Sequence, residues 1–317
     1  MLSKPAKPVR SVLDLIGGTP ILLLGRIGGS EGAEIFAKLE FLNPGGSVKD
    51  RIGVGMIDEA EKKGFLVPGG TIVEPTAGNT GIGLALAGVQ RGYRVILVVP
   101  EQFSVEKREL MRALGGEVVL TPRDDGMKGA IARAHEVAGE IEGAYVPQQF
   151  ANPGNSRIHY ETTGPEIWEQ MDHKVDGFVA GSGTGGTFTG VTRFLKEKNP
   201  ALIAVVVEPQ GSILQGGEPG PHEVEGIGAS FIPEVLDLSL ADEIMMIEDQ
   251  PAFEMVGRLA REEGLLAGSS AGAAVCATVR VARRLGPGKR VVTIIPDSSE
   301  RYLSKGVYSN WRDASES

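Results

Sequence analysis

A single lysine follows a loop of small residues and opens a predicted helix. Residues 43–48 read Asn-Pro-Gly-Gly-Ser-Val and lead to Lys49, and apolar residues recur at helical spacing over residues 52–63. A lysine at the start of a helix is usually solvated, because lysines are seldom buried. Beside the positive helix terminus and Arg51, however, the cation is disfavoured, so the pKa of Lys49 is expected to fall and its free amine to form a Schiff base with a carbonyl group. The local sequence leaves both interpretations open.

A glycine-rich turn, residues 181–187, follows a predicted strand and begins a predicted helix. Backbone N–H groups at such a turn bind phosphate together with the helix terminus. The alternative is a tight turn that needs glycine for its backbone angles. The spacing of Gly181, Gly183 and Gly186 also fits the dinucleotide fingerprint, and Glu208 ends the next predicted strand where a ribose-binding acid is expected. NAD is therefore a second candidate ligand of this turn.

Two further turns of small residues precede predicted helices, at residues 76–81 and 268–272. The first offers hydroxyl and amide side chains with backbone N–H groups and could bind a carboxylate, but an ordinary helix cap explains it equally well. For the second, a cap is the default interpretation. Together with the lysine loop, the three turns favour a phosphate-anchored cofactor and a small carboxylate-bearing substrate. Pyridoxal phosphate would use all four segments, because its aldehyde needs a lysine, its phosphate a glycine-rich turn and its ring nitrogen a polar partner.

The composition excludes several classes of protein. The 317 residues carry 32 Lys and Arg against 41 Asp and Glu, and this net charge of -9 argues against a nucleic-acid-binding surface. The four histidines lack ligand spacing, so no metal site is expected. The single cysteine, Cys276, stands among small apolar residues and is expected to be a buried thiol in a reducing compartment. No apolar run approaches the roughly 20 residues that span a bilayer, and no secretion signal is recognisable. These features predict a cytoplasmic protein without membrane contact.

Predicted strands and helices alternate along the chain, which indicates an α/β fold. Continuous apolar runs such as residues 95–99 suit parallel strands that are buried on both faces. Residues 209–233 form a long irregular segment crowded with Gly, Pro and Ser, and loops of that length are usually functional or disordered. The chain is long enough for two lobes, with a cleft at the ends of their strands.

Over residues 13–311 these motifs resemble those of the cysteine synthase and cystathionine β-synthase family. The resemblance implies a two-lobed fold-type II pyridoxal-phosphate enzyme, in which each lobe is an open, mostly parallel sheet with flanking helices. It implies a smaller, mobile lobe of residues 1–12 and 36–148, and a larger, phosphate-binding lobe of residues 13–35 and 149–317. A homodimer is expected from the same resemblance.

The resemblance also assigns roles to individual residues. Lys49 would hold the cofactor aldehyde and later act as the general base. Ser270 would face the ring nitrogen, where a neutral serine makes the ring a milder electron acceptor and favours β-elimination. The cofactor would also contact Asn79, Gly183, Thr184, Gly185, Gly186 and Thr187, and the substrate would contact Thr76, Gly78, Thr80, Gln149 and Gly226.

Departures from the family pattern bear on the substrate. Ala77 stands where most relatives have serine. Four segments together are most similar to bacterial members that use O-acetylserine and can accept homocysteine: Ala77, residues 225–228, residues 270–272 and residues 296–301. The expected reaction is replacement of the acetate of O-acetyl-L-serine by sulfide or homocysteine, which gives cysteine or cystathionine. Serine is the alternative first substrate, although Ala229 stands where serine-using cystathionine β-synthases have tyrosine. The competing hypotheses are an NAD-dependent enzyme built on Glu208 and a catalytically idle binding partner.

Overall fold

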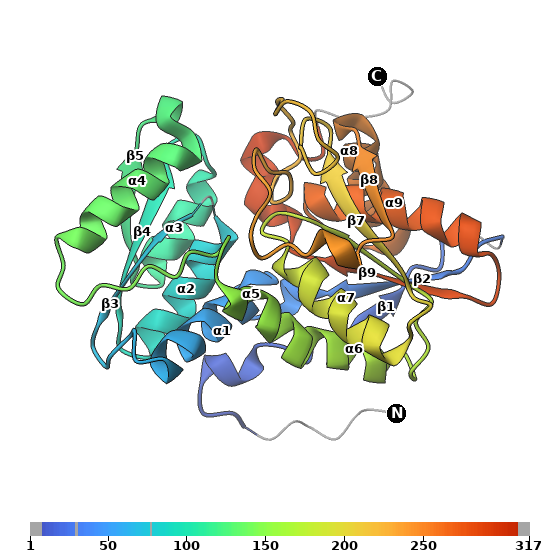
Figure 1. The fold of residues 1–317 in the computed structure, drawn as a ribbon. Coiled ribbons are helices and arrows are strands. Elements are labelled where there is room, and N and C mark those ends of the chain that lie inside the picture. The colour runs from blue at the N-terminus through green and yellow to red at the C-terminus, as the bar shows by residue number, and fades with distance from the viewer. Residues whose placement is uncertain (1–7, 29–30, 77, 310–317) are drawn as a thin grey trace.

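The protein consists of two α/β lobes that lie side by side (Figure 1). The computed structural model describes residues 8–28, 31–76 and 78–309. The smaller lobe is built on a three-stranded sheet and the larger lobe on a six-stranded sheet. The α/β prediction is confirmed.

The smaller lobe has a parallel sheet in the order β3-β4-β5. Its strands are β3 (Thr71–Pro75), β4 (Arg94–Pro100) and β5 (Glu117–Thr121). Successive side chains of a strand point to opposite faces, so Ile96 and Val98 pack beneath helix α4 (Gly126–Gly139), while Val95 and Leu97 pack beneath three other helices. Those helices are α1 (Lys49–Lys62), α2 (Asn79–Gln90) and α3 (Val105–Ala113). The continuous apolar run of β4 is thus buried on both sides, as predicted.

The larger lobe has six strands in the order β1-β2-β9-β6-β7-β8, all parallel except β1. The strands are β1 (Ile21–Leu23), β2 (Glu34–Leu39), β6 (Gly177–Gly181), β7 (Ile203–Pro209), β8 (Glu243–Ile247) and β9 (Arg290–Ile295). Helices α8 (Asp249–Glu263) and α9 (Ser269–Leu285) cover one face, and α6 (Gly164–Gln170) and α7 (Gly186–Lys198) cover the other.

Short helices complete the chain between these elements. They are η1 (Val12–Leu15), η2 (Glu40–Leu42), η3 (Arg123–Asp125), α5 (Pro153–Ile158), the π-helix η4 (His159–Thr163), η5 (Leu238–Leu240) and η6 (Ser299–Lys305). None of the described helices is long and apolar enough to cross a membrane.

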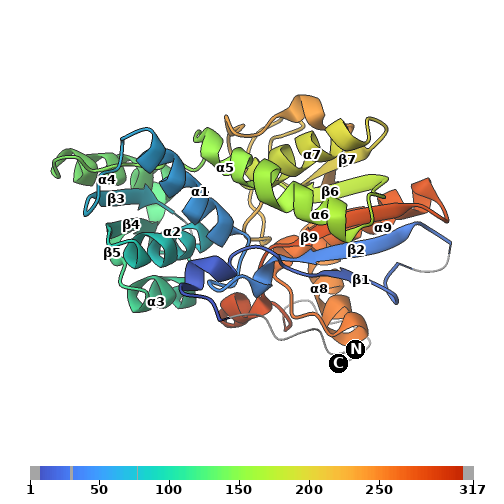
Figure 2. The ribbon, with the colours of Figure 1, turned by 90° about the horizontal axis from the view of Figure 1, so that it is seen from below.

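Helix α1 carries the predicted lysine and lies between the two sheets, next to α5 (Figures 1 and 2). It approaches α2 so closely that a Cβ atom added at Gly53 would lie 2.4 Å from the carbonyl oxygen of Gly83. Glycine at this crossing therefore sets the spacing of the two helices. The predicted boundary between the lobes, at residue 36, falls within strand β2 of the six-stranded sheet. The division of the chain into a smaller, mobile lobe and a larger lobe stays a prediction.

Candidate active site

A cleft of about 940 Å³ lies between the lobes. Parallel strands of both sheets end beside it, which is where α/β proteins bind ligands. Twelve of the thirteen residues predicted for the site line the cleft. The thirteenth, Gly186, is the first residue of α7. Ala77 falls outside the described residues. The structure thus brings together three turns and one lysine from separate parts of the sequence.

Lys49 is the first residue of α1 and is partly buried in the cleft wall. The loop before it is fixed to the larger lobe, because the backbone N–H of Val48 donates to the carbonyl oxygen of Pro296 at 2.8 Å. Loss of surrounding water lowers the pKa of Lys49 to about 8, against the opposing effect of the Asp297 carboxylate. The pKa falls in the predicted direction, but the cause is burial and not the neighbouring Arg51 cation. A useful fraction of the amine is therefore unprotonated near neutral pH.

The glycine-rich turn joins β6 to α7, and its residues Gly183, Thr184, Gly185 and Thr187 line the cleft. Gly185, the residue before α7, has a φ of 82°, a left-handed conformation that favours glycine. The Thr184 hydroxyl accepts a hydrogen bond from the Asn155 side chain at 3.0 Å, and the Thr187 hydroxyl contacts Nε2 of His159 at 3.2 Å. The arrangement suits an anion with several acceptor oxygens, such as a phosphate monoester.

Asn79 of the smaller lobe is held between two residues of the larger lobe. Its Nδ2 donates to Asp297 Oδ2 at 2.6 Å, and its Oδ1 accepts from Arg301 Nη1 at 2.5 Å. The Tyr302 hydroxyl donates to the same Asp297 carboxylate, and burial raises the pKa of that hydroxyl well above its usual value. Asp297 is one of the residues that line the cleft. Its other carboxylate oxygen, Oδ1, is buried and has no hydrogen-bond partner among the described residues. An unpaired buried carboxylate oxygen is costly, and a hydrogen-bond donor placed beside it would stabilise this part of the cleft wall.

The predicted carboxylate-binding loop at the start of α2 is already shaped by its own hydrogen bonds. The Thr76 hydroxyl accepts from the backbone N–H groups of Gly78 and Gly81, both at 3.2 Å. The Thr80 hydroxyl donates to the Gln149 side chain at 2.7 Å, which joins this loop to the segment that crosses between the lobes.

A buried carboxylate that the sequence analysis missed positions Gln149. Glu74, at the end of β3, accepts from the backbone N–H groups of Gln148 at 2.9 Å and Gln149 at 3.1 Å. Burial raises the pKa of Glu74 to about 7, partly offset by these two hydrogen bonds. Gln148 has a φ of 57°, so the backbone here is held in a conformation that non-glycine residues rarely adopt.

Three charged residues that line the cleft form a connected group: Lys107, Glu225 and Lys305. Glu225 lies 3.1 Å from Lys107 of α3 and 3.1 Å from Lys305 of η6. The Lys107 ammonium also lies 4.2 Å from the centre of the Tyr302 ring. Glu225 precedes Gly226, whose α-carbon faces the Ser270 hydroxyl. The long irregular segment, residues 209–233, therefore supplies one wall of the cleft.

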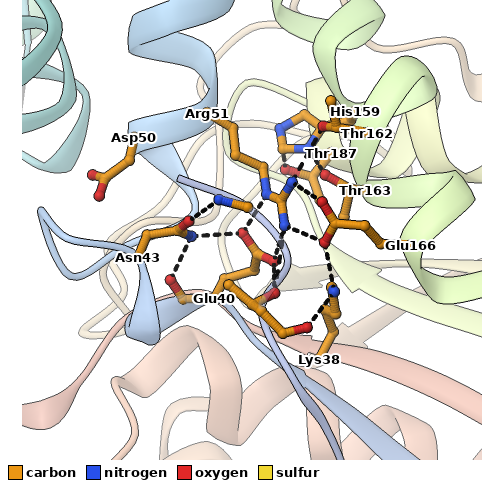
Figure 3. A network of polar contacts seen from close by, with 12 residues as sticks. Lys38, Glu40, Asn43, Asp50, Arg51, His159, Thr162, Thr163, Glu166 and Thr187 are labelled. Carbon is orange, nitrogen blue, oxygen red and sulfur yellow. Dashed lines mark hydrogen bonds and ion pairs between the residues drawn. The ribbon is translucent and has the colours of Figure 1, made fainter. Parts of the chain in front are cut away.

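Arg51 links the lysine helix to the larger lobe through a buried network (Figure 3). Its guanidinium donates to Glu40 at 2.7 and 2.8 Å and to Glu166 twice at 2.7 Å. Lys38 donates to Glu166 at 2.7 Å. The two positive charges of Arg51 and Lys38 therefore balance the two negative charges of Glu40 and Glu166. Burial favours the neutral acid of Glu166, but the Arg51 and Lys38 cations outweigh it and hold its pKa at about 2. The first turn of α1 is therefore fixed by charge on the side away from the cleft.

Glu208 has a different role from the one that the NAD hypothesis required. Its carboxylate accepts from the backbone N–H of Leu214 at 2.8 Å and from the Gln215 side chain at 3.0 Å, and only 1% of the residue is exposed. Both oxygens hold the loop after β7, and Glu208 is not among the residues that line the cleft. The NAD hypothesis is not supported, because the fingerprint glycines serve a turn whose acidic partner faces the protein interior.

The polar groups of the cleft fit pyridoxal phosphate. A lysine of lowered pKa, a glycine-rich turn at a helix terminus and a buried serine are the groups that its aldehyde, phosphate and ring nitrogen require. A family model described as "Pyridoxal-phosphate dependent enzyme" matches residues 12–297. The chain belongs to this family. Pyridoxal 5'-phosphate is its cofactor, and among the described residues no group of three or more acidic, histidine or cysteine side chains could hold a metal ion.

Relatives within the family are similar over nearly their whole length. The chain is 51% identical over 300 residues to the O-acetylserine dependent cystathionine beta-synthase of Bacillus subtilis, covering 95% of this chain and 98% of that one. It is 49% identical over 305 residues to the cysteine synthase of Staphylococcus aureus, covering 96% and 98%. The crystal structure of O-acetylserine dependent cystathionine beta-synthase from Helicobacter pylori superimposes with a TM-score of 0.90 at 48% identity, covering 96% of this chain and 100% of that one. The predictions of the family and of the fold-type II architecture are confirmed.

Several residues of the site were not predicted from the sequence. They are Asp297, Arg301, Tyr302, Glu74, Lys107, Glu225 and His159. Asp297 and Glu74 each follow the apolar run of a strand, and this position at the carboxyl end of a strand is a signal that could have found them. The others lie on helices or in an irregular loop, where no local pattern distinguishes them.

Proposed function

We propose that this enzyme catalyses β-replacement on O-acetyl-L-serine, in which a sulfur nucleophile takes the place of acetate. Sulfide would give cysteine and homocysteine would give cystathionine. The observation that carries the proposal is the meeting, in one cleft, of Lys49 with the turn that suits a phosphate and the loop that suits a carboxylate. The relatives named for O-acetylserine or cysteine synthesis support the choice of substrate.

The cofactor would be held at three points. Lys49 would bond to its aldehyde, the turn from Gly183 to Thr187 would hold its phosphate, and Ser270 would face its ring nitrogen. Asn79 would contact the ring hydroxyl with the part of its amide that Asp297 and Arg301 leave available. When bound, the cofactor withdraws electrons from the α-carbon of an amino acid joined to it, so the α-proton becomes acidic and a β-substituent can leave.

Lys49 would then move the proton. Its amine has a pKa of about 8 and lies in the cleft wall, so it can accept the α-proton near neutral pH and return it after the new bond has formed. The bond between the β-carbon and the acetate oxygen breaks with both electrons going to oxygen. The bond between sulfur and the β-carbon forms from a lone pair of the deprotonated nucleophile, hydrosulfide or the homocysteine thiolate, and acetate is released as the anion.

The substrate carboxylate would bind at the start of α2. Thr76 and Thr80 supply hydroxyl groups there, and the backbone of Gly78 lines the same part of the cleft. The Thr80 hydroxyl now donates to the Gln149 side chain, so this hydrogen bond must break before Thr80 can donate to the substrate. Substrate binding would therefore also release the Gln149 side chain. Gly226, on the opposite wall, would leave room for the β-substituent.

The test is a competition between nucleophiles. Purified protein loaded with pyridoxal 5'-phosphate is mixed with O-acetyl-L-serine and equal concentrations of sulfide and homocysteine, and acetate, cysteine and cystathionine are measured separately. We expect acetate release matched by thiol-dependent product, and loss of both in Lys49→Ala. Acetate release with neither thiol product, or full turnover in Lys49→Ala, would refute the proposal.

The same assay with L-serine in place of O-acetyl-L-serine decides between the two first substrates. Release of cystathionine at the same rate from serine would favour the serine-using alternative. We further propose that the enzyme is a cytoplasmic homodimer. Light scattering on the purified protein measures its mass and so tests the dimer.

A further inference from the structure

His159 contacts two hydroxyl groups, and one of them belongs to Thr187, which ends the turn that suits a phosphate (Figure 3). Its Nδ1 is 2.8 Å from the Thr163 hydroxyl and its Nε2 is 3.2 Å from the Thr187 hydroxyl. His159 and Thr163 are fully buried, whereas Thr187 lines the cleft. One imidazole therefore connects the protein interior to a residue at the cleft surface.

The direction of these hydrogen bonds follows from what a phosphate can accept. A phosphate monoester at neutral pH offers acceptor oxygens and needs donors. The Thr187 hydroxyl has one hydrogen, so if it donates that hydrogen to phosphate it must accept its other hydrogen bond. The only partner that can supply this bond at 3.2 Å among the described residues is Nε2–H of His159. A neutral imidazole that donates from Nε2 must accept at Nδ1, here from the Thr163 hydroxyl.

The surroundings of His159 favour this neutral form. Burial lowers the pKa of His159 well below its usual value, and the cations of Arg51 and Lys49 lower it further. An imidazolium would donate from both nitrogens, and the Thr163 hydroxyl would then have to point its hydrogen elsewhere. The neutral ring with its proton on Nε2 leaves no such conflict.

We propose that His159 is a positioning residue for the cofactor phosphate: it donates from Nε2 to Thr187, so that the Thr187 hydrogen is directed into the cleft. The relay runs from the Thr163 hydroxyl to His159, from His159 to Thr187, and from Thr187 to the phosphate. This inference rests on the proposal that the turn ending at Thr187 holds the phosphate. It predicts that His159 affects the binding of the phosphate group and not of the ring.

The tautomer can be measured on the native protein. The chain has four histidines, so two-bond ¹H–¹⁵N correlation spectra of protein labelled in histidine are simple, and the spectrum of His159→Gln assigns the His159 signals. We expect a proton on Nε2 and none on Nδ1, both without cofactor and with pyridoxal 5'-phosphate. A proton on Nδ1, or on both nitrogens, would overturn the proposal.

A matched pair of variants tests the donor. The side-chain nitrogen of His159→Gln can take the place of Nε2, whereas that of His159→Asn is one carbon shorter and lies near the position of Nδ1. Binding of pyridoxal 5'-phosphate and of pyridoxal, which lacks the phosphate, is measured on each protein. We expect about tenfold weaker pyridoxal 5'-phosphate binding in His159→Asn, near-native binding in His159→Gln and no change for pyridoxal.

The outcomes separate a positioning role from a structural one. A parallel loss of both ligands in His159→Asn, or equal losses in the two variants, would overturn the proposal. Thr187→Val and Thr187→Ser give a second test if His159→Asn does not fold, because the valine variant should lose the same tenfold factor and the serine variant should keep native affinity. If the native protein binds pyridoxal but gains nothing from the phosphate, the site assignment itself is wrong, while the tautomer still decides the hydrogen bonding of His159.

Discussion

Arg51 offers a direct test of the network that fixes the lysine helix. Only 2% of its surface is exposed, and its guanidinium makes four hydrogen bonds to the carboxylates of Glu40 and Glu166. Arg51→Met keeps much of the side-chain volume and removes the charge. Lys38 still neutralises Glu166, so the variant leaves Glu40 as a buried carboxylate without a cation.

The size of the effect follows from that single unpaired charge. Breaking a buried ion pair by removing one partner costs about 3–5 kcal/mol. If the 317 residues unfold together, their entropy of unfolding is about 0.7 kcal/mol/K, because each residue contributes roughly 2.1 cal/mol/K. The expected fall in melting temperature is the ratio of the two, about 4–7 °C.

The assay is thermal unfolding of the cofactor-free protein, followed by circular dichroism. Arg94→Met is the matched control, because Arg94 also makes a two-point contact with a carboxylate, Glu117, but both side chains are about half exposed. We expect a shift below about 1 °C for this control, since exposed ion pairs contribute little.

The double variant Arg51→Met/Glu40→Gln isolates the cause. Replacing Glu40 by a neutral amide removes the unpaired charge, so the double variant should recover a large part of the loss seen in Arg51→Met. A melting temperature for Arg51→Met within 1 °C of the native value would refute the argument. So would a double variant less stable than Arg51→Met, because the loss would then come from packing and not from charge.

Three further predictions concern the cleft and the helices. The rate at which pyridoxal 5'-phosphate attaches to the cofactor-free protein should rise about tenfold per pH unit below the Lys49 pKa of about 8 and level off above it. An inflection near 10.5 in the native protein would contradict the lowered pKa of Lys49. Asp297→Asn removes the charge that raises this pKa, so its inflection should lie at lower pH than the native one, and an inflection at the native pH or above would contradict this expectation. Burial raises the pKa of Cys276 from 9.0 to about 11, so iodoacetamide should label it about 100-fold more slowly at pH 8 than an exposed thiol, and equal rates would show that it is solvated. Gly53→Ala should cost roughly 1–3 kcal/mol because its Cβ would press on a carbonyl oxygen of α2, whereas Gly139→Ala, with no atom within 4 Å, should be neutral or slightly stabilising in urea unfolding.

Much of the fold was accessible from patterns of neighbouring residues. The run at residues 95–99 predicted a buried parallel strand, and β4 is covered by helices on both faces. The segment from Pro153 to Gln170 was not predicted as helical. It forms α5, a π-helix and α6 in direct succession, and its shape depends on packing against α1 and α7.

The candidate site divides in the same way. The lysine loop and the three small-residue turns were found because glycine, serine and threonine meet local backbone requirements that a short sequence displays. The contacts that orient them were not found. Asn79 is bound by Asp297 and Arg301, which lie 218 and 222 residues further along the chain.

Glu208 shows how a motif can mislead when its partners are distant. Its spacing from the glycine-rich turn fitted a dinucleotide site, yet its carboxylate binds the loop after its own strand. Spacing fixes where a residue stands along a strand, but the loops that pack around the strand end decide which hydrogen bonds its side chain makes.

The sequence by itself determined the alternation of strands and helices, the turns suited to a phosphate and a carboxylate, and the position of Lys49 at the start of a helix. These features depend on backbone angles and hydrophobic periodicity, which act over a few residues. Only the tertiary structure decided which charges are paired, such as Arg51 with Glu40 and Glu166, and which way His159 and Asn79 are held. Burial creates the demand for those partners, and burial is a property of the whole packed chain.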